Sequence, residues 1–243
     1  MQPIEEPPLS LELVSARLAS IEARLRHAAA AAGQDPAGFR IVAVTKGFGL
    51  EAVRAALGAG LRCLGESRVQ EALPKVEAEP GAEWHLIGRL QANKVRLAVR
   101  AFAVIHAVDS LELLVRTDRI SGEEGRAPRL LLEVNLSGES TKAGFPASWF
   151  GAQAAADGEL VHALRGVSHA QPAGLMTIAP LGVGVDQARA CFATLRGLRD
   201  ALQRRVGPLP ELSMGMTADA DAAVAEGATL VRIGTGLFGP RPG

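Results

Sequence analysis

The chain has 243 residues, of which 48% are apolar and 21% charged, with 26 basic and 26 acidic side chains. This size and composition are typical of one large globular domain with a well-buried core, so we expect a single domain over residues 1–243. The balanced charge excludes an electrostatic basis for binding nucleic acid or an anionic membrane, and no apolar run is long enough to span a bilayer.

The N-terminal segment predicts a loose tail followed by one helix. Residues 1–9 are acidic and contain proline, and they lack the basic and apolar regions of a secretory signal. Apolar residues then recur at spacings of three and four from Leu11 to Ala28, as on one face of an amphipathic helix. Gly33 suits the C-cap of this helix.

Eight short apolar runs alternate with helix-like segments over the rest of the chain. The runs are 41–44, 61–64, 84–87, 103–106, 130–135, 173–178, 211–214 and 230–233, and the helix-like segments are 50–59, 67–78, 91–100, 110–121, 147–163, 184–205 and 218–226. Eight strands separated by helices predict a (β/α)8 TIM barrel with an extra N-terminal helix. The alternative is a doubly wound open sheet.

Polar residues follow nearly every predicted strand, and this favours the barrel. They are Lys46, Glu66, His85, Asp109, Asn135, Met176-Thr177, Ser213 and Arg232. In a barrel these residues converge on one face, where ligands bind, whereas in an open sheet they would spread along an edge.

The cysteines indicate no metal site. Cys63 and Cys191 are far apart, and neither has a cysteine or histidine nearby at metal-ligand spacing. Two unclustered cysteines fit a reducing compartment, and with the N-terminal segment they predict a cytoplasmic protein.

Lys46 directly follows the buried run Ile41 to Val44, so the sequence delivers an amine to the end of a strand. A lysine there is either a solvated surface charge or an amine in a partly dry pocket, with a lowered pKa that suits Schiff-base formation.

The segments after the last two strands predict an anion site. In VRIGTGLFG, Gly234 and Gly236 follow a strand and let backbone N–H groups approach a phosphate, although a tight turn explains them equally. Ser213 ends the neighbouring strand and could contribute a hydroxyl to the same phosphate. Thr217 or Asp219 suits the cap of the following helix.

Arg232 is unusual because it lies inside an apolar strand. A buried arginine needs a partner, since it cannot be neutralised by losing a proton. The structural partner would be a carboxylate such as Glu66, and the functional partner a ring nitrogen or an anionic ligand. The sequence leaves both open.

Two polar loops, WHLIGRLQANK (84–94) and NLSGESTKAGF (135–145), complete the predicted site, although solvated turns would look the same. With AVTK (43–46), GESRVQE (65–71), GLMTI (174–178), LSMGMTAD (212–219) and VRIGTGLFG (231–239), they make seven motifs in order. On these motifs the chain resembles the pyridoxal phosphate homeostasis proteins over nearly its full length.

The resemblance implies a barrel like the N-terminal domain of alanine racemase, with pyridoxal 5′-phosphate (PLP) held as a Schiff base on Lys46. It implies that the phosphate lies against Ser213, Gly234 and Thr235. It also implies that Arg232 faces the pyridine nitrogen, which makes the ring a poorer electron sink. The chain departs from the family pattern GENYVQE, because Ser67 and Arg68 replace asparagine and tyrosine.

Three functions compete. The resemblance implies a PLP carrier that serves vitamin B6 and amino-acid homeostasis, with PLP-requiring apo-enzymes as recipients. A racemase of low activity is the alternative, but the chain has no tyrosine to act on the second face of a substrate, and a substitute such as His85 would be needed. A Schiff-base aldolase explains Lys46 but not Arg232. We expect a PLP-binding monomer, with a dimer as the alternative, and we assign no catalytic residue.

Overall fold

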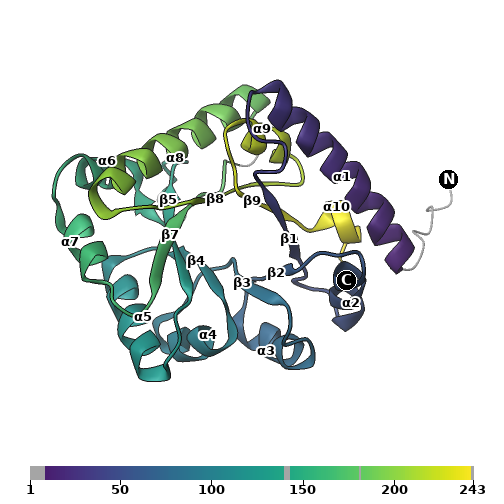
Figure 1. Cartoon of the computed structure of the whole chain (residues 1–243), viewed down its shortest axis with the longest axis horizontal. Coiled ribbons are helices and arrows are strands. Elements are labelled where there is room, and N and C mark those ends of the chain that lie inside the picture. Colours follow the sequence, from purple (N-terminus) through teal and green to yellow (C-terminus); the bar gives the residue numbers. More distant parts are fainter. Residues whose placement is uncertain (1–8, 140–142, 181, 242–243) are drawn as a thin grey trace.

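The computed structural model describes residues 9–139, 143–180 and 182–241, and within them eight parallel strands close into a barrel (Figure 1). Around the barrel these strands are β1 (Arg40–Val44), β2 (Cys63–Glu66), β3 (Glu83–Leu86), β4 (Val104–Val108), β5 (Arg129–Asn135), β7 (Gln171–Met176), β8 (Glu211–Met216) and β9 (Leu230–Ile233). Because β9 pairs in parallel with β1, the sheet has no edge there. The prediction of a TIM barrel is confirmed, and the open sheet is wrong. A two-residue strand, β6 (Phe145–Pro146), pairs in parallel with the end of β5.

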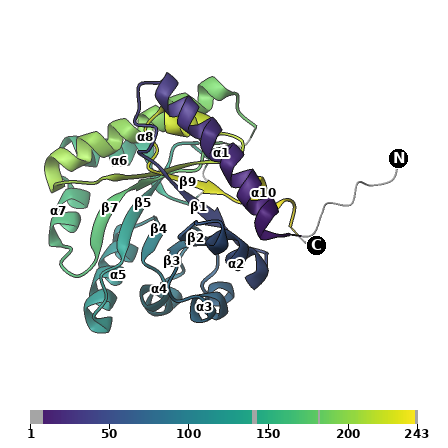
Figure 2. The same ribbon diagram turned by 45° about the vertical axis from the view of Figure 1, so that its right-hand side comes forward.

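Helices surround the barrel and follow its strands (Figures 1 and 2). They are α2 (Leu50–Gly58), α3 (Val69–Ala78), α4 (Val95–Ala101) after the short 3-10 helix η1 (Ala92–Lys94), α5 (Leu111–Glu124), α6 (Ala147–Ala155), α7 (Glu159–Gly166), α8 (Val185–Val206), α9 (Ala220–Ala225) and α10 (Thr235–Phe238). The segment 147–163, expected as one helix, is two, because Ala156 and Gly158 have extended backbones. Among these described elements, no helix is long and apolar enough to cross a membrane.

The predicted extra helix, α1 (Leu11–Ala31), lies on the outside of the barrel against α2, α9 and α10 (Figure 2). Ser10 begins it as the N-cap, since its hydroxyl accepts a hydrogen bond from the Leu13 backbone N–H at 3.2 Å. The helix buries one apolar stripe: Val14, Leu18, Ile21, Leu25 and Ala29. Ala32 is the C-cap, and Gly33 follows it. Residues 1–8 of the predicted tail lie outside the described residues.

The interior of the barrel changes character along its axis. An inner apolar cluster fills its middle: Val42, Cys63, Val104, Ala107, Leu131, Met176 and Leu230. Charged side chains begin four of the strands at the amino-terminal end, which we call the base. Lys46 and the loops predicted to bind a ligand lie past the carboxyl ends of the strands, which we call the mouth. The fold therefore places the predicted site where TIM barrels bind their ligands.

Candidate functional site

Lys46 lies two residues past the end of β1, at the mouth of the barrel, and is half-buried. Burial lowers the pKa of its amine, and the nearby Arg241 and Arg232 guanidiniums lower it further, against an opposing effect of Glu66. Gly47 has a positive φ of 77°, and a Cβ there would lie 2.9 Å from the Arg241 side chain, so the glycine allows this close approach. The environment thus shifts the Lys46 amine toward its neutral, nucleophilic form.

Arg232 on β9 points into the barrel and is only 4% exposed. Its Nη1 donates to Ser213 Oγ at 2.6 Å, and its Nη2 donates to the Thr177 carbonyl at 2.9 Å. Burial lowers the pKa of this guanidinium to about 10, so it is still charged at neutral pH. Among the described residues it forms no ion pair with a carboxylate. The charges of Asp219 and Glu133 favour the charged guanidinium without a direct ion pair, so it keeps spare donors for an acceptor supplied by a ligand.

Glu66, the structural partner considered for Arg232, is engaged elsewhere. Its Oε1 accepts hydrogen bonds from Thr45 Oγ1 at 2.7 Å and from Lys75 Nζ at 2.6 Å, and the carboxylate is fully buried. Its Oε2 is also buried and has no hydrogen-bond partner within the described part of the chain. A buried carboxylate oxygen without a donor is costly. The mouth therefore contains both a buried cation without an ion pair and a carboxylate oxygen without a donor.

Ser213 lies deeper than the sequence suggests. It is the third residue of β8, fully buried, and its Oγ lies 2.6 Å from Arg232 Nη1 and 2.9 Å from His106 Nδ1. The hydroxyl that reaches the glycine-containing turn belongs to Thr217, whose Oγ1 accepts from the Gly236 backbone N–H at 3.3 Å. Position 217 lies beyond the end of β8, whereas position 213 lies inside the barrel. The strand end predicted from the sequence came too early, so the prediction did not distinguish the depths of these two hydroxyls.

The turn after β9 forms a small open cradle. Gly234 precedes α10, Thr235 is exposed, and the Thr235 and Thr217 hydroxyl oxygens lie 3.5 Å apart. A Cβ on Gly236 would lie 3.0 Å from the Thr217 methyl carbon, so a side chain there would crowd the cradle. Backbone N–H groups at the start of a helix, together with two hydroxyls, suit a phosphate.

Comparison with known proteins identifies the family. A family model described as the N-terminal domain of alanine racemase matches residues 16–242. The pyridoxal phosphate homeostasis protein of Synechocystis is 41% identical over 85% of this chain and 93% of its own length, and that of Aquifex aeolicus is 37% identical over 93% and 97%. The chain belongs to the pyridoxal phosphate homeostasis protein family.

Solved structures agree with this membership. PipY of Synechococcus elongatus, whose structure is known with PLP bound, is 41% identical over 93% of this chain and all of its own, with a TM-score of 0.80. An alanine racemase of Clostridium difficile is 16% identical over 99% of this chain and 60% of its own, with a TM-score of 0.74. At that identity the second likeness concerns the fold alone.

The departures from the family pattern lie at the edge of the site. Ser67 is half-buried, and a Cβ on Gly88 would lie 2.4 Å from its carbonyl oxygen, so the loops after β2 and β3 touch here. Arg68 is 75% exposed at its side chain and pairs with Glu71 at 2.7 Å. It is thus engaged as a surface charge at the start of α3.

Two further residues refine the predicted site. His85 is fully buried, and both of its ring nitrogens are bonded, to Glu83 at 2.9 Å and to His106 at 2.8 Å, so it is no free base at the mouth. Glu133 on β5 was not predicted. Burial, followed by the charge of Asp109, raises its pKa to about 7. It is the one charged residue in the apolar run 130–135, which was the available signal.

The second polar loop is organised by Asn135. Its side-chain amide donates to the Glu139 carbonyl at 2.8 Å, and its Oδ1 accepts from the Ser137 hydroxyl at 2.9 Å. Lys142 of the same motif lies outside the described residues. These bonds are those of a local turn, in agreement with the alternative considered for this loop.

Proposed function

We propose that this chain binds PLP at the mouth of its barrel, holds it covalently and reversibly on Lys46, and serves PLP and amino-acid homeostasis in the cytoplasm. The names of its relatives and the PLP-bound structure of PipY support this function. The observation that carries it is the pairing of a lysine of lowered pKa with Arg232, a buried cation that forms no carboxylate ion pair among the described residues. The chemistry of the mouth fits an anionic aromatic aldehyde.

Different residues at the mouth would contact different parts of PLP. PLP supplies an aldehyde that condenses with amines, together with a phosphate and a pyridine nitrogen. Lys46 would provide the amine. Gly234, Thr235 and Thr217 would hold the phosphate through backbone N–H groups and hydroxyls. Ser213 would contribute through Arg232, because its Oγ accepts a hydrogen bond from Arg232 Nη1 at 2.6 Å.

The same residues favour holding the cofactor over using it in catalysis. Arg232 would face the ring nitrogen as a charged donor and keep that nitrogen unprotonated, which weakens the ring as an electron sink. A racemase also needs an acid or base on the second face of its substrate. The chain has no tyrosine, and His85, the substitute considered, is buried with both ring nitrogens bonded.

Reductive trapping tests the proposed attachment. The purified chain is incubated with PLP, reduced with borohydride and digested, and mass spectrometry locates the adduct. We expect visible absorbance before reduction and one PLP-sized adduct, on Lys46. Lys94, in η1 after β3, is the control amine. A colourless protein, or equal labelling of Lys94, would overturn the proposal.

Delivery to other proteins is the second part of the proposal. We expect a PLP-requiring apo-enzyme to regain activity when mixed with the loaded chain, and to do so faster than the measured rate of PLP release into buffer allows. Reactivation no faster than that release would contradict direct transfer and would make the chain a passive reservoir. Light scattering during the same experiment checks the expectation of a monomer.

A further inference from the structure

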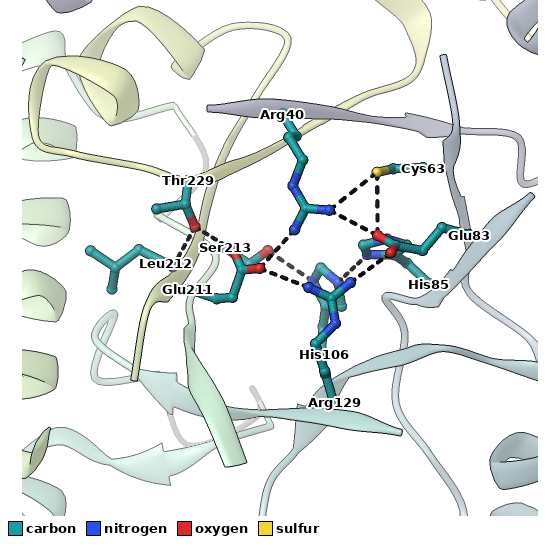
Figure 3. A network of polar contacts seen from close by, with 10 residues as sticks. All are labelled: Arg40, Cys63, Glu83, His85, His106, Arg129, Glu211, Leu212, Ser213 and Thr229. Atoms are coloured by element: carbon teal, nitrogen blue, oxygen red, sulfur yellow. Dashed lines mark hydrogen bonds and ion pairs between the residues drawn. The ribbon is translucent and has the colours of Figure 1, made fainter. Parts of the chain in front are cut away.

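Four charged side chains form a closed ring at the base of the barrel. They begin alternate strands of the barrel: β1, β3, β5 and β8. Arg40 lies 3.0 Å from Glu83 and 2.7 Å from Glu211, and Arg129 lies 2.8 Å from Glu83 and 2.9 Å from Glu211 (Figure 3). Each carboxylate therefore bridges two guanidiniums, and the four charges sum to zero.

A series of hydrogen bonds, which we call the relay, runs from this ring to the mouth. Glu83 Oε1 lies 2.9 Å from His85 Nε2, and His85 Nδ1 lies 2.8 Å from His106 Nε2. His106 Nδ1 lies 2.9 Å from Ser213 Oγ (Figure 3), and Ser213 Oγ lies 2.6 Å from Arg232 Nη1. Both histidines and Ser213 are fully buried, so water does not compete for these bonds.

The residues at the two ends of the relay, Glu83 and Arg232, determine the direction of every hydrogen bond in it. Arg232 can only donate, and an ionised Glu83 can only accept. His85 must therefore donate from Nε2 and accept at Nδ1, which makes His106 donate from Nε2 and accept at Nδ1. Ser213 then donates its hydroxyl proton to His106 and turns its lone pairs toward Arg232. The reverse direction would set an unprotonated His85 nitrogen against the Glu83 carboxylate.

The charges of the region favour this protonation pattern. Burial lowers the pKa of both imidazoles, that of His106 strongly, so both rings are neutral. The hydrogen bond from His85 lowers the pKa of Glu83, and Arg129 and Arg40 lower it further, so that carboxylate is ionised. One proton on each imidazole is the number that the relay requires when all its hydrogen bonds run in one direction.

A metal site is the competing explanation for the residues at the base end of the relay. The ligand atoms of Cys63, Glu83 and His85 lie within 4.8 Å of one another. However, Arg40 Nη1 already lies 3.0 Å from Glu83 Oε1 and 3.8 Å from Cys63 Sγ, where a cation would have to sit. Burial also raises the pKa of the Cys63 thiol to about 11, which disfavours the thiolate that a metal needs.

We propose that Glu83, His85 and His106 are positioning residues for the ligand site. Through the Ser213 hydroxyl they hold the Arg232 guanidinium in place at the mouth, so that the ionic ring at the base orients a group that contacts the ligand. The identity of that ligand as PLP rests on the proposed function. The relay itself does not, because its bonds exist without a ligand.

Histidine tautomers in the PLP-free protein test the relay directly. Long-range ¹H–¹⁵N correlation spectra distinguish imidazoles protonated at Nε2 from those protonated at Nδ1. We expect neutral His85 and His106, both protonated at Nε2 and with slowly exchanging N–H groups. His162, an exposed histidine whose Nδ1 lies 2.9 Å from the Gly158 carbonyl oxygen, is the comparison resonance. An Nδ1–H tautomer, or a charged ring, at either buried position at neutral pH would overturn the relay.

PLP release then tests positioning. His106→Leu removes both bonds, and we expect about five- to tenfold faster release, the effect of about one net hydrogen bond. His106→Gln keeps an acceptor and a donor and should release PLP within about twofold of the wild type. In an Arg232→Ala background, His106→Leu should add nothing. Leu131→Ala, another change inside the barrel, controls for destabilisation.

The outcomes separate the two hypotheses. If His106→Leu releases PLP at the wild-type rate, or if its effect matches that of Leu131→Ala or persists without Arg232, the residues are only structural and the proposal is wrong. If the wild-type chain does not bind PLP at all, the proposed function fails, and the tautomer measurement alone decides the relay.

Discussion

The two ends of one barrel treat charge in opposite ways. At the base, Arg40, Glu83, Arg129 and Glu211 form a closed ring in which each charge has two partners of opposite sign. At the mouth, Arg232 is buried without a direct ion pair among the described residues, one oxygen of Glu66 has no donor, and the pKa of Lys46 is lowered. Every charge of the base is ion-paired, whereas the mouth leaves a guanidinium without an ion pair and a carboxylate oxygen without a donor. Unbalanced buried charge therefore marks the binding end of the barrel.

The comparison predicts that substitutions at the two ends have different consequences. A charge held in a network contributes to the free energy of unfolding, and removing its partner is costly. A charge without a partner already costs desolvation energy, so its removal is cheap for the fold and expensive only for the ligand.

Lys46→Ala should have the largest effect on the ligand. We expect no covalent attachment of PLP, because no other amine occupies this position, and no loss of thermal stability, because a half-buried cation is removed. Reductive trapping and thermal melting of the PLP-free protein measure the two effects. Lys94→Ala should retain the adduct. A clear fall in the melting temperature of Lys46→Ala would show that mouth charges are structural and would erase the contrast.

Glu211→Gln should have the largest effect on the fold. Glu211 accepts from Arg40, Arg129 and the Thr229 hydroxyl, and its loss as an anion leaves two guanidiniums sharing Glu83. We expect a loss of about 1–3 kcal/mol in the free energy of unfolding, below the cost of breaking a fully buried pair, because the Arg40 side chain is 42% exposed. Urea denaturation of the PLP-free protein measures it.

The matched control is a surface pair. Glu22 lies 3.0 Å from Arg26 at i,i+4 spacing on α1. Glu22→Gln should change the free energy of unfolding by about 0.5 kcal/mol or less. If Glu211→Gln costs no more than this, the ring at the base is merely a surface feature.

Stability should fall in mild acid because His85 and His106 are buried as neutral rings. Their pKa values in the folded state lie below the unfolded value of about 6.5, so below that pH the unfolded chain binds more protons. Their contribution is complete above the unfolded pKa and is lost as pH falls below it. Each histidine should remove about 1.4 kcal/mol per pH unit. Urea denaturation from pH 8 to pH 5.5, about one unit past the unfolded pKa, measures the slope.

His106→Gln isolates one histidine in the same titration. It should lower the slope of unfolding free energy against pH by the contribution of one imidazole, because glutamine does not titrate. A slope that stays at the wild-type value would mean that His106 is protonated in the folded protein, against the neutral state that the base-to-mouth relay requires.

The barrel could be predicted because its signal is local. Each strand is a short apolar run bounded by helices, and the eight runs became the eight barrel strands. Lys46 lies where the sequence placed it, past β1, because one strand end is enough to locate it. Ser213 was misjudged because the depth of a residue inside a barrel depends on where its strand ends. Its run was expected to end at 214, whereas β8 continues to Met216.

The relay could not be predicted because it depends on closure of the whole barrel. Glu83 and His85 are on β3, His106 is on β4 and Ser213 is on β8, and no spacing in the sequence relates them. Glu133 was hidden for a different reason, since six residues of mostly apolar character outweigh one acid in a pattern. Local periodicity thus predicts elements, and contacts across the barrel must be measured.

Ser67→Asn should give the smallest effect and sharpen the view of the mouth. The resemblance implies asparagine here, and its longer amide offers a donor and an acceptor that serine cannot extend as far. We expect about two- to fivefold slower release of PLP, up to the value of one net hydrogen bond, with an unchanged free energy of unfolding. Stopped-flow measurement of PLP release checks this, with Ser67→Ala as the control. If Ser67→Ala releases PLP at the wild-type rate and Ser67→Asn slows release, position 67 is a vacant contact in this chain. If both variants equal the wild type, position 67 lies outside the site, and the unbalanced charges of Lys46, Arg232 and Glu66 alone define the binding end.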